Sequence, residues 1–189
     1  ERILIHPTKT TTLFACSNKS VYHSVDKGQT WSSVFQLTGK AQLRDMLFKP
    51  NDPSTLYISG DNALYSSNNE GASWTNNKNS LNQIFENARI AIAVNKNKPE
   101  ELYVYYSDLS NSNWYSTPNK IEKSTDGGTK WEVINSSNLS GMAHTQEIEI
   151  SPQNHIYAGG ITLFKSTNNG ESFKRQDKNS IHSDFHAIN

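Results

Sequence analysis

One short motif, found four times, restricts the fold of this chain more than any other feature of its sequence. Its pattern is Ser-x-Asp/Asn-x-Gly-x-x-Trp/Phe. The motif residues of the four copies are Ser24, Asp26, Gly28 and Trp31; Ser67, Asn69, Gly71 and Trp74; Ser124, Asp126, Gly128 and Trp131; and Ser166, Asn168, Gly170 and Phe173. Four copies in 189 residues indicate a chain assembled from one repeated structural unit.

Each copy of the motif predicts a tight turn between two strands. The Asp or Asn side chain accepts hydrogen bonds from backbone N–H groups two or three residues on, which imitates a turn. The glycine supplies a positive φ without steric cost, and the aromatic ring folds over the turn and buries apolar area. Because Asn69 and Asn168 lack the charge of a carboxylate, we expect their turns to be weaker than those of Asp26 and Asp126.

The spacing of the motif predicts units of four strands. The aromatic residues of successive copies are 43, 57 and 42 residues apart, and periods of about 40–45 residues are typical of four-stranded propeller blades. Short runs with period-two alternation precede each turn. First strands are expected in 2–7, 45–50, 89–94 and 147–152, second strands in 12–15, 55–58, 101–104 and 155–158, and third strands in 20–23, 63–66, 120–123 and 162–165. A fourth strand should begin at each aromatic residue, and one helical turn is expected in 81–88.

The motif resembles the Asp-box, also called the BNR repeat. This repeat occurs in sialidases, sortilin-type receptors, xyloglucan-cleaving hydrolases and secreted β-propellers, and the chain is most similar in character to Bacteroidetes-type BNR-repeat proteins. The resemblance implies that the motif residues are structural. It also implies that ligands bind at the end of the blades away from these turns.

We therefore predict an all-β fold, a β-propeller of four-stranded antiparallel blades. The blades should occupy about 1–40, 41–85, 86–140 and 141–180, with 181–189 as the innermost strand of a fifth. Four blades and the start of another favour part of a ring of seven or eight blades, which the rest of the parent chain would complete. A closed ring of four blades is the alternative.

Composition excludes several classes of partner. The chain has 18 basic and 18 acidic residues, so it lacks the basic face that nucleic acid requires. No run approaches the roughly 18 apolar residues of a membrane-spanning helix. The single cysteine, Cys16, allows no internal disulfide and is interpreted as a small core residue. The chain starts at Glu1 without a signal peptide, so we expect a processed or excised segment of a secreted or cell-surface bacterial protein.

The first candidate site is an insertion in the third unit, 105–119, between its expected second and third strands. Its candidate ligand-binding residues are Tyr105, Tyr106, Asp108, Trp114 and Tyr115. Aromatic rings stack on the C–H faces of sugars, while carboxylates and amides bind hydroxyl groups. We predict carbohydrate contacts here. The alternative is a surface loop whose rings pack on the neighbouring blade.

The second candidate site is near the end of the chain. His182, Asp184 and His186 alternate, so in an extended strand their side chains lie on one side. Together they could bind a divalent metal or a ligand, or supply acid–base groups near neutral pH. A structural hydrogen-bond cluster is the alternative, and His144 could add to either. No other cofactor is implied.

Two functions fit these features, and the non-catalytic one is favoured. It is a propeller that binds a carbohydrate or protein partner through the loops of one face. The alternative is a sialidase-like or xyloglucanase-like glycoside hydrolase. A sialidase needs clustered arginines, and Arg2, Arg44 and Arg89 each begin a first strand. Hydrolysis also needs two carboxylates. Asp45 and Asp184 are the acids expected near the central channel around which the blades of a propeller are arranged. A sortilin-like receptor domain is disfavoured, because the cysteine-rich modules of such receptors are missing.

The insertion hypothesis makes a direct prediction. Replacing Trp114 with Ala should abolish carbohydrate binding on a glycan array, because the stacking ring is lost, and should leave the melting curve unchanged. An unaltered array signal would remove the insertion from the candidate sites.

Overall fold

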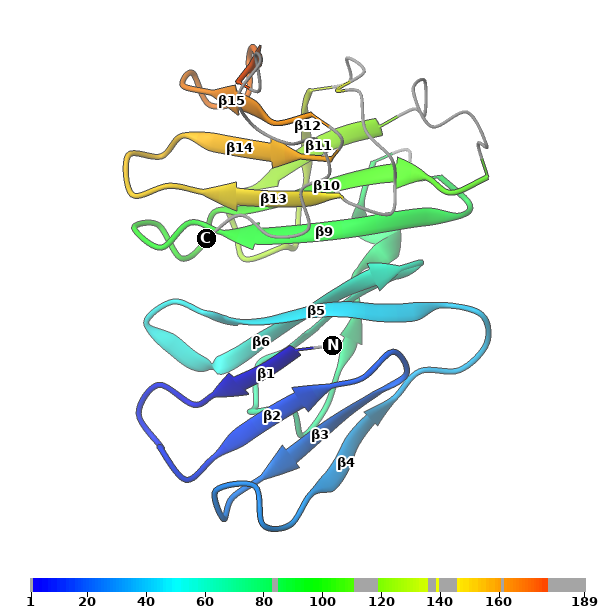
Figure 1. Ribbon diagram of the computed structural model, residues 1–189, viewed down its shortest axis with the longest axis vertical. Coiled ribbons are helices and arrows are strands. Elements are labelled where there is room, and N and C mark those ends of the chain that lie inside the picture. The colour runs from blue at the N-terminus through cyan, green and yellow to red at the C-terminus, as the bar shows by residue number, and fades with distance from the viewer. Residues whose placement is uncertain are drawn as a thin grey trace. The chain divides into compact units, whose positions relative to one another are not determined.

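The computed structural model describes residues 2–82, 85–110, 119–135, 139, 146–160 and 162–176 (Figure 1). Its described regular structure is β-strand apart from one 3-10 turn, η1 (Lys78–Ser80). A helical turn was expected in 81–88, and η1 lies just before that range. Within the described ranges no helix is long and apolar enough to cross a membrane. The chain divides into two compact units, Glu1–Lys78 and Asn79–Asn189, and each is described separately below.

The first unit consists of two antiparallel sheets. Its strands are β1 (Arg2–Ile5), β2 (Leu13–Cys16), β3 (Ser20–Ser24) and β4 (Ser32–Gln36), then β5 (Gln42–Lys49), β6 (Asp52–Asp61), β7 (Ala63–Ser67) and β8 (Thr75–Asn76). Within each sheet, consecutive strands pair as hairpins. β6 is longer than the four residues predicted, and asparagines at positive φ, Asn51 (63°) and Asn62 (54°), form the tight connections at its two ends.

The second unit repeats the arrangement. Its strands are β9 (Ala88–Val94), β10 (Leu102–Asp108), β11 (Asn119–Ser124) and β12 (Glu132–Asn135), then β13 (Glu147–Ile150), β14 (Ile156–Gly159), β15 (Phe164–Ser166) and β16 (Lys174–Arg175). Each sheet is again a series of antiparallel hairpins (Figure 1). The prediction of an all-β fold with four-stranded antiparallel sheets is confirmed.

Each unit has its own apolar core between its two sheets. In the first unit, Phe14 and Val21 from one sheet pack with Met46, Leu56 and Ile58 from the other. The core of the second unit consists of Ala91, Ala93, Tyr103, Tyr105, Ile121, Leu139, Ile148, Ile150, Ile156 and Ala158. Because side chains alternate along a strand, each strand contributes every second residue to such a core.

Cys16 belongs to the first core, as predicted. Its side chain is buried, and burial raises the pKa of the thiol to about 11. The thiolate, which is the reactive form of cysteine, is therefore disfavoured near neutral pH.

The aromatic residues of the turns differ in burial, which gives a matched test. Trp131 is 9 % exposed, and its Nε1 donates to the Gly128 carbonyl oxygen at 3.0 Å. Trp31 makes the equivalent bond to Gly28 at 3.0 Å but is 39 % exposed.

We expect Trp131→Ala to lower the free energy of unfolding by about 3–5 kcal/mol, as truncation of large buried aromatic residues does. Trp31→Ala should cost clearly less, because less apolar area is lost. Urea unfolding of both variants measures this difference. Equal losses would mean that burial of the ring does not set the stability of the turn.

Candidate functional site

The repeated motif forms the same hydrogen-bonded turn in all four sheets. In the third sheet, Ser124 Oγ donates to Asp126 Oδ1 at 2.8 Å and accepts from the Gly128 N–H at 2.9 Å. Asp126 Oδ1 also accepts from the Lys130 N–H at 2.9 Å. The four glycines at this position are in the left-handed region, with φ between 81° and 95°. The motif residues thus satisfy one another and the turn backbone.

The amide turns compensate for the missing charge. Asp26 Oδ2 accepts a hydrogen bond from the Thr30 hydroxyl at 2.6 Å. At the same place Asn69 Nδ2 donates to Ser73 Oγ at 2.8 Å, and the hydroxyl becomes the acceptor. Asn168 uses Ser172 in the same way, at 3.0 Å. The amide turns therefore keep this hydrogen bond, with donor and acceptor exchanged. The expectation that these turns are weaker considered only the missing charge.

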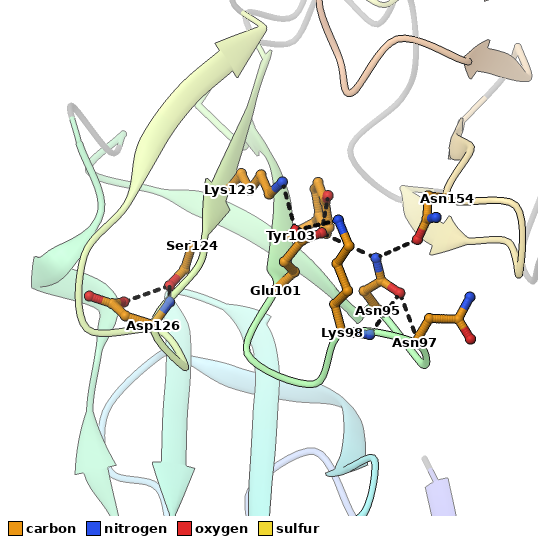
Figure 2. Close-up of polar contacts among 9 residues, drawn as sticks. All are labelled: Asn95, Asn97, Lys98, Glu101, Tyr103, Lys123, Ser124, Asp126 and Asn154. Atoms are coloured by element: carbon orange, nitrogen blue, oxygen red, sulfur yellow. Dashed lines mark hydrogen bonds and ion pairs between the residues drawn. The ribbon is translucent and has the colours of Figure 1, made fainter.

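A polar cluster lies at the same end of the third sheet as its motif turn (Figure 2). Glu101 accepts from Lys98 and Lys123 at 3.1 and 3.2 Å, from the Tyr103 hydroxyl at 3.1 Å and from Asn95 Nδ2 at 3.1 Å. Although burial opposes ionisation, the bond from Lys98 and the charge of Lys123 hold the pKa of Glu101 below its ordinary value. No motif in the sequence predicted this cluster.

The cluster continues to the fourth sheet within the same unit. Asn95 Nδ2 lies 2.9 Å from Asn154 Oδ1, and Asn97 Nδ2 donates to the Pro152 carbonyl oxygen at 2.7 Å. Lys96 and Glu149 add an ion pair at 3.6 Å. Because the contacts join two turns and satisfy the buried groups, we interpret the cluster as a structural connection between the third and fourth sheets.

The opposite end of the sheets, where the first strands begin, carries charged side chains in the first unit. Arg2 Nε lies 3.4 Å from Asp45 Oδ1. Arg44 contacts Asp61 Oδ2 through Nη2 at 2.5 Å and through Nε at 3.2 Å. The antiparallel register explains the second pair, because Gln42 near the start of β5 lies opposite Asp61 at the end of β6. The structure thus forms two separate pairs: Arg2 with Asp45, both named from the sequence, and Arg44 with Asp61, which was not predicted.

A β-bulge positions Arg44. The register of β5 and β6 shifts between Leu43 and Asp45, which leaves Arg44 as the extra residue. Opposite the bulge, a Cβ on Gly60 would lie 2.0 Å from the Gln42 carbonyl oxygen, so only glycine allows this approach of the strands. Bulges redirect side chains and are frequent beside functional sites.

Two predicted ligand-binding residues of the insertion are corrected by the structure. Tyr105 and Tyr106 belong to β10, which continues to Asp108, and their exposures are 2 % and 0 %. Tyr106 hydrogen bonds to the buried Glu122 carboxylate and lies 2.7 Å from the Asn82 carbonyl oxygen. Both tyrosines lie in a strand and their rings are buried, so they are not available to bind a ligand.

The remaining predicted site residues are largely outside the described part of the chain. Asp108 is described, and its Oδ1 accepts from the Ser110 N–H at 2.9 Å, so it forms the turn after β10. Trp114, Tyr115, His144, His182, Asp184 and His186 lie outside the described residues. Among the residues that are described, no group of three or more His, Cys, Asp or Glu side chains is arranged to hold a metal ion.

Comparison with known proteins supports the fold. No family model matches the chain, and no curated protein matches it significantly in sequence. An ancestral GH74 enzyme has 19 % identity and a TM-score of 0.71 over 95 % of this chain and 24 % of its own. The GH74 xyloglucanase of Xanthomonas campestris has 18 % identity and a TM-score of 0.68 over 93 % of this chain and 29 % of its own.

A third similar structure is YCF48 bound to D1 peptide, with 17 % identity and a TM-score of 0.53 over 76 % of this chain and 42 % of its own. At such identities these likenesses show the fold alone: the sheets are blades of a β-propeller. The chain spans about a quarter of the length of the GH74 enzymes.

The turn chemistry predicts a pH dependence. Hydrogen bonds from the Thr30 side chain and backbone and from Ser24 lower the pKa of Asp26 to about 2. In the unfolded chain the value is about 3.9. The folded state is therefore stabilised by this carboxylate above pH 4, and the stabilisation is lost as the pH falls towards 2.

We expect Asp26→Asn to melt close to the wild type at pH 7, because its amide can donate to Thr30 as Asn69 does to Ser73. As the pH is lowered from about 4 to 2, the melting temperature of the wild type should decrease relative to that of the variant. Asn69→Asp, the reverse change, should introduce the same dependence into the second turn. If the difference in melting temperature between the wild type and Asp26→Asn were constant with pH, the lowered pKa of Asp26 would be contradicted.

Proposed function

We propose that this chain is a segment of a non-catalytic propeller that binds carbohydrate at the ends of the sheets where the first strands begin. The protein would be secreted or located at the bacterial cell surface, and the rest of the parent polypeptide would complete the ring. The observation that carries the proposal is the pairing of Arg2 with Asp45 and of Arg44 with Asp61 at this end.

The chemistry of these pairs suits a sugar. A sugar hydroxyl both donates and accepts hydrogen bonds. The Arg2–Asp45 pair offers donors and acceptors side by side, while Arg44 offers donors only, because the Asp61 side chain is 14 % exposed and its Oδ1 is buried. The side chains of Arg2 and Arg44 are 52 % and 42 % exposed, so solutes can reach them. Hydrogen bonds to charged groups are also stronger than those between neutral groups.

The motif turns support the choice of this end. Their serine, acid or amide, glycine and ring have the contacts expected of an Asp-box, and we propose that the chain belongs to this group of propellers. In that group the ligand binds away from the Asp-box turns, which here is the end of the Arg–Asp pairs. In the second unit, the insertion residues Asp108, Trp114 and Tyr115 are proposed as further ligand-binding residues, and so are His182, Asp184 and His186, with or without a divalent metal.

The second candidate is a glycoside hydrolase, which the likeness to GH74 enzymes favours. Its candidate acids are Asp45 and Asp61 in the first unit and, as a separate candidate, Asp184 in the second. We place it second because Asp45 and Asp61 are each bound to an arginine, an arrangement that suits holding a ligand more directly than donating a proton. A protein partner on the same surface is the remaining alternative.

The test is affinity electrophoresis on a panel of polysaccharides that includes xyloglucan. Arg44→Gln should weaken binding by at least about tenfold, because a hydrogen bond to a charged group contributes roughly 1.5–3 kcal/mol. Lys27→Gln makes the same charge change at the turn end and should leave binding unaltered. Equal binding by both variants would place the site elsewhere, and release of reducing ends would favour the hydrolase.

A further inference from the structure

One face of the first sheet exposes apolar side chains that a sheet normally buries. Ile3 and Ile5, on the first strand, are 67 % and 63 % exposed. The register places Ile3 beside Ala15 and Tyr22, and Ile5 beside Leu13. We call the set the open face; it consists of Ile3, Ile5, Leu13, Ala15, Tyr22 and, in the following turn, Trp31.

The second sheet of the same unit has the same face, and there it is covered. Alignment on the turn serines Ser24 and Ser67 makes Met46, Phe48, Leu56, Ile58, Tyr65 and Trp74 the equivalent residues. Met46, Leu56 and Ile58 are fully buried in the core that they share with the first sheet. Phe35 of β4 covers the outer part of the face, with ring centroids 4.9 Å from Tyr65 and 5.6 Å from Trp74.

The second unit repeats this relationship. The equivalent residues of the fourth sheet are Ile148, Ile150, Ile156, Ala158, Phe164 and Phe173, and all pack in the core of that unit. Ile148 and Ile150 are only 4 % and 2 % exposed. Residues of the third sheet, including Ala93, Tyr103 and Ile134, cover them. In both units, therefore, the preceding sheet covers this face.

The glycines of the turns in the first, second and fourth sheets show the same difference. A Cβ on Gly71 would lie 3.2 Å from Phe14 and 3.6 Å from Val34, and one on Gly170 would lie 2.5 Å from Ile134. These neighbours belong to the preceding sheet. At Gly28 the three nearest atoms all belong to Trp31 of the same turn.

We propose that the open face is an interaction surface for a further four-stranded blade of the parent polypeptide. By analogy with the two covered faces, this blade carries an aromatic residue on its second strand, as Phe14 and Tyr103 do. It carries a β-branched residue on its fourth strand, as Val34 and Ile134 do. The inference rests on the proposed completion of the ring by the parent polypeptide and is independent of carbohydrate binding.

Cysteine labelling tests this surface. Ile5→Cys and Val25→Cys are made in the 189-residue chain and in the full-length parent protein, and maleimide labelling rates are measured. Val25 is a matched control because it is also 63 % exposed. The equivalent residues of the other three turns, Asn68, Thr125 and Thr167, are exposed as well. Asn68 and Thr167 are exposed even though the faces of their sheets are covered. The native Cys16 is buried and adds little background.

Both cysteines should react at similar rates in the 189-residue chain. In the full-length protein Ile5→Cys should react at least roughly 100-fold more slowly, since labelling then requires local opening, while Val25→Cys should be unchanged. Fast labelling of Ile5→Cys in the full-length protein would overturn the proposal. Slowing in the 189-residue chain at high concentration would also overturn it, because a second copy would then be the occupant.

A stability measurement provides an independent test. Ile3→Lys should lower the melting temperature of the full-length protein by about 5 °C or more and leave that of the 189-residue chain unchanged. Equal effects in both proteins would contradict the proposed blade. Arg44→Gln should leave the labelling rates of both cysteines unchanged, so failure of the carbohydrate proposal and failure of this one can be told apart.

Discussion

The hydrogen-bonded turn between the third and fourth strands of each sheet is the interaction on which the rest of the structure depends. The serine hydroxyl joins the acid or amide to the glycine N–H, and the ring lies over a glycine that carries no Cβ. At Gly71 and Gly170 the neighbouring sheet approaches the same point. The turn therefore closes a hairpin and also provides a packing contact between sheets, so local and tertiary structure support one another.

The two ends of the sheets use polar groups differently. At the turn end of the second unit, the bonds of Glu101 and Asn95 join successive sheets, and a satisfied buried network holds one geometry. At the other end of the first unit, Arg2 and Arg44 are paired with carboxylates but stay about half exposed. The first arrangement connects two sheets, while the second leaves charged groups accessible to solvent.

Residues whose environment is local were predicted well, and residues whose partners are distant were not. The turn residues and the order of the strands followed from spacing and turn chemistry. Tyr105 and Tyr106 were assigned to an insertion because the third repeat is longer than its neighbours, with a spacing of 57 residues against 43 and 42. Both faces of β10 are buried, and a strand buried on both faces does not alternate. The pairing of Arg44 with Asp61 depends on a bulge and on the close approach at Gly60. A glycine inside a strand can signal a bulge, but Gly60 lay beyond the expected strand 55–58.

The sequence by itself determined that the chain is all-β, that it repeats a four-stranded unit, and that a serine, an acid or amide, a glycine and a ring close each unit. These features involve residues within a few positions of one another, so turn geometry and side-chain alternation are sufficient to specify them. Only the tertiary structure decided which carboxylate each arginine meets, which tyrosines are buried and which apolar face is left uncovered. Those outcomes depend on strand register and on the packing of one sheet against the next, and such contacts join residues far apart in the chain.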